Sequence, residues 1–275
     1  MMNYINQLFN LEGKTAVITG GSGILGSEIA KGLLSAGASV SILGTTLQKI
    51  TSRVEELSEF GEKIIGLECN VLDKSRIYEV NDIVLEKFGH IDILINAAGG
   101  HVPGAVIGVD QSIFDLQIEE FEKVTDLNLN GTVLPTLVFG KSIAERKKGS
   151  IINISSMASF RAISRAVGYS AAKAAVDNFT RWMAVEMAIK FGNGIRVNAI
   201  APGFLLTSQN KDLLTNDDGS LTERGKTIIN MTPFKIFGEP DELIGTVLWL
   251  ASDASTFVTG TIIPIDGGFS INSGV

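Results

Sequence analysis

The chain of 275 residues carries a formal net charge of −7 at pH 7, with 45% hydrophobic and 19% charged residues. This balance is typical of a globular protein with a large core, and the length fits one large α/β domain or two small ones. The negative charge is spread along the chain, which argues against a nucleic-acid partner because phosphate binding needs a positive face. A few local cations would still be enough to bind an anionic substrate.

The cysteine and histidine content and the lengths of the apolar runs argue against disulfide-bonded, metal-binding and membrane-spanning classes of protein. The single cysteine, Cys69, excludes an intramolecular disulfide and a thiolate metal cluster. Neither His90 nor His101 has a partner at metal-ligand spacing, so we predict no metal site. The N-terminus lacks the pattern of a signal peptide, and no apolar run reaches the roughly 20 residues that a membrane span needs. We therefore expect a cytoplasmic protein without a membrane partner.

Apolar strands and amphipathic helices alternate along the chain after a short lead-in at residues 1–13. Short apolar runs predict strands at 14–19, 39–43, 63–69, 91–100, 149–155, 195–203 and 261–266. Apolar residues at spacings of three and four predict helices at 24–36, 46–60, 73–88, 118–147, 169–191 and 240–252. Uniformly apolar strands favour a parallel sheet that is buried on both faces. We predict a doubly wound Rossmann fold of about seven parallel strands with helices on both faces. Because no linker divides the chain, residues 1–275 are expected to form a single domain.

A glycine-rich loop joins the first predicted strand to the first long helix. Gly21, Gly23 and Gly26 satisfy the pattern G-x-G-x-x-G in the strand-to-helix context in which it binds a dinucleotide. The glycines allow a tight turn and close backbone approach, and the helix N-terminus presents free N–H groups to the pyrophosphate. The alternative is a glycine-rich turn with a structural role only.

The end of the second strand bears on the choice of cofactor. NAD-binding sites usually carry an acid here to hold the ribose 2′-hydroxyl, but this strand ends in Gly44, Thr45 and Thr46. Both threonines and Lys49 could instead donate to a 2′-phosphate, although Lys49 could equally be a solvated helix residue. We predict NAD(P) as the cofactor, with a preference for NADP.

The segment from Ser156 to Lys173 places a hydroxyl, a phenol and an ammonium near one another. Tyr169 and Lys173 are four residues apart, about one helical turn, so their side chains project from one face. A nearby cation lowers the pKa of a phenol, and a phenol tuned toward neutral pH can exchange a proton with a substrate oxygen. Ser156 ends an apolar strand that can deliver its hydroxyl beside them. Alone, a Tyr-x-x-x-Lys pair is more often a solvated helix face.

The chain resembles the short-chain dehydrogenase/reductase family in the order and spacing of its motifs, over residues 13–268. The motifs are the glycine loop, Asn96-Ala97-Ala98-Gly99, Asn128, Ser156, Tyr169, Lys173 and Pro202-Gly203. The separation of 13 residues between Ser156 and Tyr169 selects Ser156 over Ser155. The family's middle glycine falls at position 24, where this chain has Ile24, so we expect a local rearrangement of the loop rather than lost binding.

The resemblance implies a role for each catalytic residue. Tyr169 would be the general acid in reduction and the base in oxidation, while Lys173 would lower its pKa and hydrogen-bond the nicotinamide ribose. Ser156 would hold and polarise the substrate carbonyl, and the cofactor would carry the hydride. Asn128 would support a water that relays protons to Lys173, or mark a helix kink, or both. The implied cofactor-binding residues are Gly20, Ser22, Gly23, Ile24, Leu25, Gly26, Thr45, Thr46, Asn70, Val71, Asn96, Ala97, Ala98, Gly99, Tyr169, Lys173, Pro202, Gly203 and Thr207.

Parts of the second half, such as APGFLLTSQN and LLTNDDGSLTERG, resemble sugar-acid reductases of the D-mannonate oxidoreductase (fructuronate reductase) type. The added length that begins GGHVPG does so too. A substrate carboxylate calls for a fork of donors, which arginine supplies best. We predict substrate contacts from His101, Arg161, Arg165 and Asn210, with the polar stretch 207–232 as a lid. Each of these residues, taken alone, is more often a solvated loop side chain.

These features predict an NAD(P)-dependent oxidoreductase that interconverts a ketone and a secondary alcohol, on a small sugar acid such as fructuronate or mannonate. The alternatives are the same chemistry on a 3-oxoacyl thioester or a keto-polyol such as ketogluconate, and a dinucleotide-binding protein without catalysis. The family resemblance also implies a homotetramer, with which the amphipathic helices at 118–147 and 169–191 are compatible.

Overall fold

The computed structural model describes residues 4–102 and 104–274; residues 1–3 of the lead-in, Pro103 of the GGHVPG segment and Val275 lie outside the described residues. The strands are β1 (Thr15–Thr19), β2 (Ser39–Gly44), β3 (Ile64–Glu68), β4 (Ile93–Asn96), β5 (Gly149–Ile154), β6 (Ile195–Pro202) and β7 (Ile262–Ile265). Within the described residues they form one parallel seven-stranded sheet in the order β3-β2-β1-β4-β5-β6-β7. The predicted doubly wound fold is confirmed.

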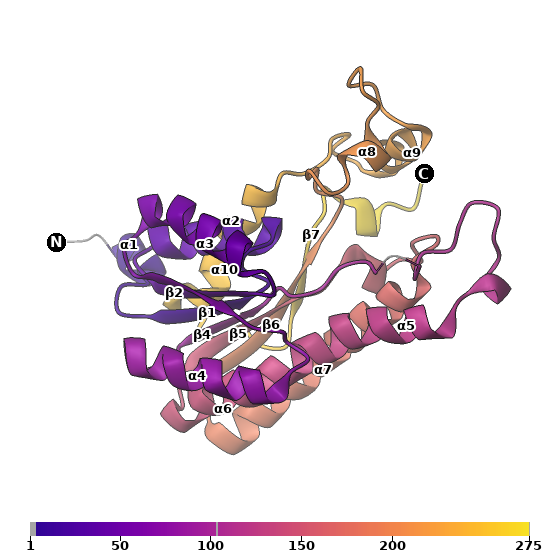
Figure 1. Ribbon diagram of the computed structural model, residues 1–275. Coiled ribbons are helices and arrows are strands. Elements are labelled where there is room, and N and C mark those ends of the chain that lie inside the picture. The colour runs from indigo at the N-terminus through magenta and orange to yellow at the C-terminus, as the bar shows by residue number, and fades with distance from the viewer. Residues whose placement is uncertain (1–3, 103, 275) are drawn as a thin grey trace.

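Helices cover both faces of the sheet. They are α1 (Tyr4–Phe9), α2 (Ile24–Ser35), α3 (Leu47–Leu57), α4 (Lys74–Phe88), α5 (Ile118–Thr125), α6 (Gly131–Arg146), α7 (Val167–Phe191), α8 (Lys211–Leu214), α9 (Glu223–Met231) and α10 (Ile244–Ala251). In Figure 1, α2, α3 and α10 lie on one face, and α4, α6 and α7 lie on the other. The short α8 and α9 project beyond the ends of the strands, close to the C-terminus.

Three helical regions differ from the sequence-based expectation. Helix α1 lies inside the predicted lead-in, too short to show a full apolar period. The predicted helix 118–147 is interrupted by a π-helical segment, Asp126–Asn130, between α5 and α6. The polar stretch 207–232 contains α8 and α9, because only part of it lacks helical periodicity.

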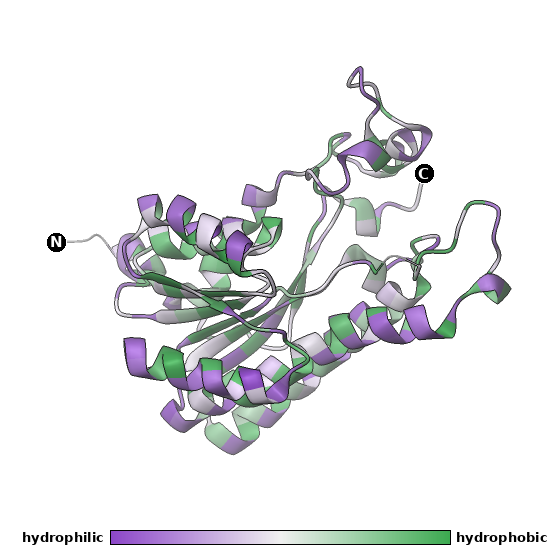
Figure 2. Ribbon diagram, viewed as in Figure 1, coloured by the Kyte–Doolittle hydropathy of each residue, from purple (hydrophilic) through white to green (hydrophobic). Residues whose placement is uncertain are grey.

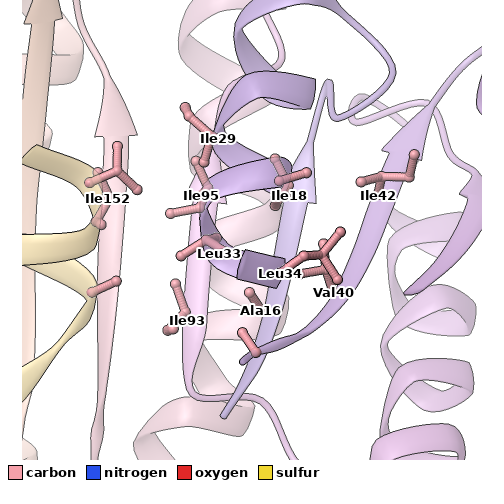
Figure 3. Packing of buried hydrophobic residues seen from close by; sticks show 14 of the residues in the cluster. Ala16, Ile18, Ile29, Leu33, Leu34, Val40, Ile42, Ile93, Ile95 and Ile152 are labelled. Carbon is pink, nitrogen blue, oxygen red and sulfur yellow. The ribbon is translucent and has the colours of Figure 1, made fainter. Parts of the chain in front are cut away.

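The core consists of two apolar layers, one on each side of the sheet, because neighbouring residues of a buried strand face opposite ways. In β1, Ala16 and Ile18 pack beneath α2, against Ile29 and Leu33 (Figure 3). Val17 faces the other layer, with α4, α6 and α7. The strands and the inward sides of the helices are accordingly the most hydrophobic parts of the ribbon (Figure 2).

The strand order places a topological switch point at the carboxyl ends of β1 and β4, where sheets of this kind form a ligand-binding crevice. From β1 the chain proceeds outward to β2 and β3, and then returns to place β4 on the other side of β1, which makes this the switch point where ligands bind. Thr19 joins the two ends, because its Oγ1 accepts from the N–H groups of Ala97 and Ala98, each at 3.1 Å. The predicted strand 91–100 therefore ends early, at Asn96, and the following residues leave the sheet along this crevice.

Candidate active site

The structure brings Ser156, Tyr169 and Lys173 together at the carboxyl edge of the sheet. Ser156 follows β5, its Oγ accepts from Ala158 N–H at 3.1 Å, and its hydroxyl lies close enough to the phenol of Tyr169 to lower the pKa of that phenol. Tyr169 and Lys173 occupy successive turns at the start of α7. The Lys173 ammonium donates to the Ile154 carbonyl at 2.8 Å and lies 5.6 Å from the centre of the Tyr169 ring. This arrangement can hold a carbonyl oxygen and exchange a proton with it.

Burial controls the titration of the cluster. It raises the pKa of Tyr169, and the hydrogen bond from Ser156 opposes this rise only in part. Burial also lowers the pKa of Lys173 to about 8, with the carboxylate of Asp177 acting in the opposite direction. The expected lowering of the Tyr169 pKa by Lys173 is therefore not the dominant effect, because desolvation of the phenol outweighs it. Asp177 lies one turn beyond Lys173 on α7, and it accepts a short, buried hydrogen bond from Ser155.

Asn128 fixes the backbone beside Lys173. It lies in the π-helical segment, as the kink interpretation expects, and π-segments inside helices are frequent at functional sites. Its side chain accepts from Gly100 N–H at 2.9 Å and donates to the carbonyls of Gly100 and Val124, both at 2.8 Å. A Cβ at Gly99 would lie 2.6 Å from Asn128 Oδ1 and 3.3 Å from Lys173 Nζ. Only glycine therefore fits without displacing these groups.

The side chain of Asn96 points into the core at the carboxyl end of β4. The side chain is almost fully buried, and its amide nitrogen donates to Thr136 Oγ1 at 2.9 Å and to Asn153 Oδ1 at 2.8 Å. Asn153 in turn donates to Thr180 Oγ1 at 2.9 Å. The network ties β4 and β5 to α6 and α7, and the place of Asn96 in the cofactor cleft stays a prediction.

The glycine loop follows β1 and packs so tightly that side chains are excluded. Gly20 has a φ of +64°, and a Cβ there would lie 2.8 Å from the Ala97 carbonyl oxygen. At Gly26 a Cβ would lie 2.8 Å from the Cα of Gly21. The first turn of α2 thus lies directly on the loop, which is the packing that a pyrophosphate-binding turn requires.

Helix α2 begins at Ile24, the position where the local rearrangement of the loop was expected. Gly23 is the N-cap of α2, and its own N–H donates to the Gly20 carbonyl at 3.0 Å. Ile24 and Leu25 form the first helical turn, where no acidic residue and no side-chain cap occupies the backbone N–H groups. These free donors at a helix N-terminus suit an anion.

The end of β2 offers hydroxyl donors and no carboxylate. Thr45 and Thr46 are exposed, and Thr46 begins α3 without a side-chain capping bond. Ser22 lies directly over Gly44, where a Cβ would overlap its hydroxyl. Lys49 is exposed, and no ion pair is found for it among the described residues. The residues at this edge fit either nicotinamide dinucleotide.

The end of β3 forms the neighbouring wall of the same edge. Glu68 is exposed and stands in register with the last residue of β2. Asn70, at the predicted adenine position, uses its side-chain oxygen to accept from Leu72 N–H at 3.0 Å. Val71 is buried against Gly131, where a Cβ would lie 3.0 Å from Val71 Cγ2. Together these residues shape the wall of the crevice next to Thr45.

The segment after β6 forms a tight loop. Pro202 ends the strand, and Gly203 N–H donates to the last residue of β7 at 2.8 Å. Thr207 N–H donates to Asn210 Oδ1, and Asn210 Nδ2 donates to the Leu205 carbonyl, both at 2.8 Å. The side chain of Asn210 thus holds the loop together, and its contact with a substrate stays a prediction.

The two arginines predicted to bind a substrate carboxylate are engaged elsewhere. Arg161 donates to the carbonyls of Ser270 at 2.7 Å and Asn272 at 3.1 Å, which fastens the C-terminal segment. Arg165, with a φ of +75°, donates to the Ile107 carbonyl at 2.6 Å. Both guanidinium groups therefore bind backbone oxygens, and their contact with a substrate carboxylate stays a prediction.

His101 lies beside the catalytic phenol. Its ring centre is 4.5 Å from that of Tyr169 at an interplanar angle of 38°, while its outer side is open to solvent. The pKa of His101 is lowered, mainly by partial burial of its ring and less by the positive charges of Arg224 and Lys173. Sequence reasoning did not single out Arg224, which lies in α9 within the polar stretch 207–232, because nothing in that stretch distinguishes one cation from another.

The described residues contain no group of three or more metal-ligating side chains that could hold a metal ion. No helix in the described part of the chain is long and apolar enough to cross a membrane.

Comparisons with known proteins agree with this geometry. A family model described as enoyl-(acyl carrier protein) reductase matches residues 20–270. An uncharacterized oxidoreductase, UxuB, from Bacillus subtilis is 46% identical, over 97% of this chain and 98% of that protein. A 2-dehydro-3-deoxy-D-gluconate 5-dehydrogenase from Formosa agariphila is 35% identical, over 95% of this chain and 94% of that protein.

Solved structures show the same architecture with cofactors bound. A Haemophilus influenzae protein, provisionally named a D-mannonate oxidoreductase and solved with bound NAD, has a TM-score of 0.91 and 41% identity, over 98% of this chain and 100% of that one. A gluconate 5-dehydrogenase from Burkholderia cenocepacia, in complex with NADP and tartrate, has a TM-score of 0.85 and 28% identity, over 98% and 99% of the two chains. The chain accordingly belongs to the short-chain dehydrogenase/reductase family of oxidoreductases, which act on alcohol and ketone groups.

Proposed function

We propose that this oxidoreductase interconverts a ketone and a secondary alcohol on a sugar acid, such as fructuronate and mannonate, with Tyr169 as the general acid and base. The observation that carries the proposal is the cluster of Ser156, Tyr169 and the buried Lys173, whose ammonium lies 5.6 Å from the centre of the Tyr169 ring, at the carboxyl edge of the sheet where the glycine loop also lies. The sugar-acid names of the relatives and the polar loops around the crevice support the substrate class.

In the reductive direction the chain's own residues handle the oxygen and the proton. The nicotinamide, when bound, supplies a hydride to the carbonyl carbon. The hydroxyls of Ser156 and Tyr169 donate hydrogen bonds to the carbonyl oxygen, and Tyr169 transfers its proton as charge develops there. Lys173 favours the phenolate that remains, which offsets the burial that raises the pKa of Tyr169. Asn128 would hold a water that returns a proton towards Lys173.

We further propose a preference for NADP over NAD. Thr45 and Thr46 follow β2 where a carboxylate would repel a 2′-phosphate, and Lys49 is exposed in the first turn of α3. Glu68 is the nearest acid in register and acts against this preference. The ratio of kcat/KM with NADPH to that with NADH measures the outcome directly.

A substrate panel tests the proposed reaction. Keto sugar acids, neutral ketoses and an acetoacetyl thioester would be offered with NADPH and with NADH in parallel. We expect the keto sugar acids to give the highest kcat/KM. A higher value for the thioester would favour the 3-oxoacyl alternative, in line with the family model's description, and cofactor binding without turnover on any substrate would favour a non-catalytic protein.

We also propose a homotetramer. Helix α7 exposes an apolar stripe of Trp182, Val185 and Ile189, which are 59%, 59% and 72% exposed. Residues three and four apart lie on one helix face, so the stripe is continuous and suits burial against a second copy. Light scattering on purified protein measures the assembly, and Trp182→Glu should reduce its mass.

A further inference from the structure

We propose that Arg224 and His101 form a carboxylate-binding subsite beside Tyr169, with Arg224 carried to the site by α9. The inference rests on the proposed function, since it assigns a position to the anionic group of the proposed sugar acid. It replaces Arg161 and Arg165, whose guanidinium groups bind backbone carbonyls.

Arg224 has the properties of an anion receptor. It lies in the first turn of α9 and is half-buried, and its guanidinium has no hydrogen bond or ion pair to any residue that the structure describes. The acid next to it, Glu223, is exposed and pairs instead with Lys226 at 2.7 Å. A guanidinium has five N–H donors and no acceptor, so partial burial without a partner is costly, and an incoming carboxylate would satisfy it in a bidentate way.

His101 connects Arg224 to the catalytic phenol. One side of its ring packs on Tyr169 with 4.5 Å between centres, and the other side is open. Arg224 lies within electrostatic range of this ring, because its positive charge adds to burial in lowering the pKa of His101. With its pKa below the ordinary value, His101 is neutral at neutral pH and can donate one N–H, while Arg224 supplies the full positive charge.

The pairing separates the substrate classes that the fold alone leaves open. A sugar acid presents a carboxylate a few bonds from its carbonyl group, so Arg224 can hold the first while Ser156 and Tyr169 hold the second. A neutral ketose lacks that anion and would leave Arg224 unpaired. The subsite should therefore discriminate by charge, through binding, and not through the proton-transfer step.

Binding of tartrate to the NADPH complex tests the subsite without any reaction, because cofactor and hydroxy acid are both in their reduced forms. The matched variants are Arg224→Gln and Lys226→Gln, which remove one positive charge each from the same helix. The chain has two histidines, so the imidazole resonances can be assigned with one His90→Gln control. We expect tartrate to shift the His101 resonance and raise its pKa in the wild type and in Lys226→Gln. In Arg224→Gln we expect the tartrate dissociation constant to rise on the order of 10- to 100-fold, and the pKa of His101 to rise before tartrate is added.

Equal tartrate affinity in Arg224→Gln and the wild type would overturn the proposal. NADPH affinity within about twofold of wild type shows that Arg224→Gln is folded, and Arg224→Lys, which keeps the charge and loses the fork, should bind tartrate with intermediate affinity. Kinetics separate this inference from the proposed function. If wild type and Arg224→Gln reduce a keto sugar acid with equal KM, the subsite is wrong and the proposed function stands. If no keto sugar acid is reduced but Arg224→Gln still loses tartrate, the subsite stands and the proposed substrate is wrong.

Discussion

Replacing Gly26 with alanine should weaken dinucleotide binding by changing one methyl group. Gly26 lies in the first turn of α2, and its Cβ would be 2.8 Å from the Cα of Gly21 and 2.9 Å from the carbonyl carbon of Gly20, where ordinary contacts begin at 3.4 Å. The loop and the helix must therefore separate by roughly 0.5 Å or more, and overpacking of this kind costs about 1–3 kcal/mol. The better helix propensity of alanine returns at most about 1 kcal/mol.

The displaced loop should lose backbone N–H contacts to the pyrophosphate, so we expect the NADPH dissociation constant to rise at least about tenfold. Gly245→Ala is the matched control, because Gly245 is an exposed residue of α10 with nothing within 4 Å of a new Cβ. It should leave NADPH affinity unchanged and raise the unfolding free energy by about 0.4–1 kcal/mol. Nicotinamide fluorescence titration and urea unfolding measure both quantities. NADPH affinity equal in the two variants would refute the assignment of this loop to the dinucleotide.

Three further changes test other parts of the site. Burial lowers the pKa of Lys173 from 10.5 to about 8, so between these pH values the side chain of Lys173 is protonated in the unfolded chain and deprotonated in the folded one. The unfolding free energy of the wild type, relative to that of Lys173→Met, should therefore rise by about 3 kcal/mol as the pH increases through this window. Urea unfolding of both proteins at the two ends of the window checks this, and a constant difference would contradict it. Thr45→Asp should shift the ratio of kcat/KM towards NADH by at least about tenfold, since a carboxylate there accepts from the ribose 2′-hydroxyl and repels a 2′-phosphate; an unchanged ratio would show that the 2′ position lies elsewhere. Arg161→Ala should leave KM within about twofold while amide exchange at Ser270 and Asn272 quickens, because this side chain fastens the C-terminal segment; a large rise in KM would restore Arg161 to the substrate site.

The fold could be predicted because its determinants are local in the sequence. The strands are mainly apolar and buried, and the glycine loop directly follows β1. The alternation of such strands with amphipathic helices is enough to predict a parallel sheet with a ligand site at β1. Tyr169 and Lys173 share a helix, so their spacing alone predicts a common face.

Long-range partners are what the sequence could not supply. Arg161 bonds carbonyls 109 and 111 residues away, and every residue offers a carbonyl, so no side-chain pattern predicts that choice. Asn96 follows a strand as a cleft residue would, yet its amide turns into the core to meet Asn153. The pKa of Tyr169 depends on burial, which residue spacing does not report. The position of Arg224 near His101 depends on where α9 packs, which the sequence of α9 does not reveal.

Tyr169→Phe offers the sharpest measurement, because it removes one hydroxyl and leaves the ring that packs on His101. In a single turnover of the best keto sugar acid with NADPH, we predict a loss of hydride-transfer rate on the order of 10²- to 10⁴-fold, the range that general acid catalysis contributes, with NADPH affinity within about twofold of wild type. A rate close to that of the wild type would contradict the role of Tyr169 as the proton donor.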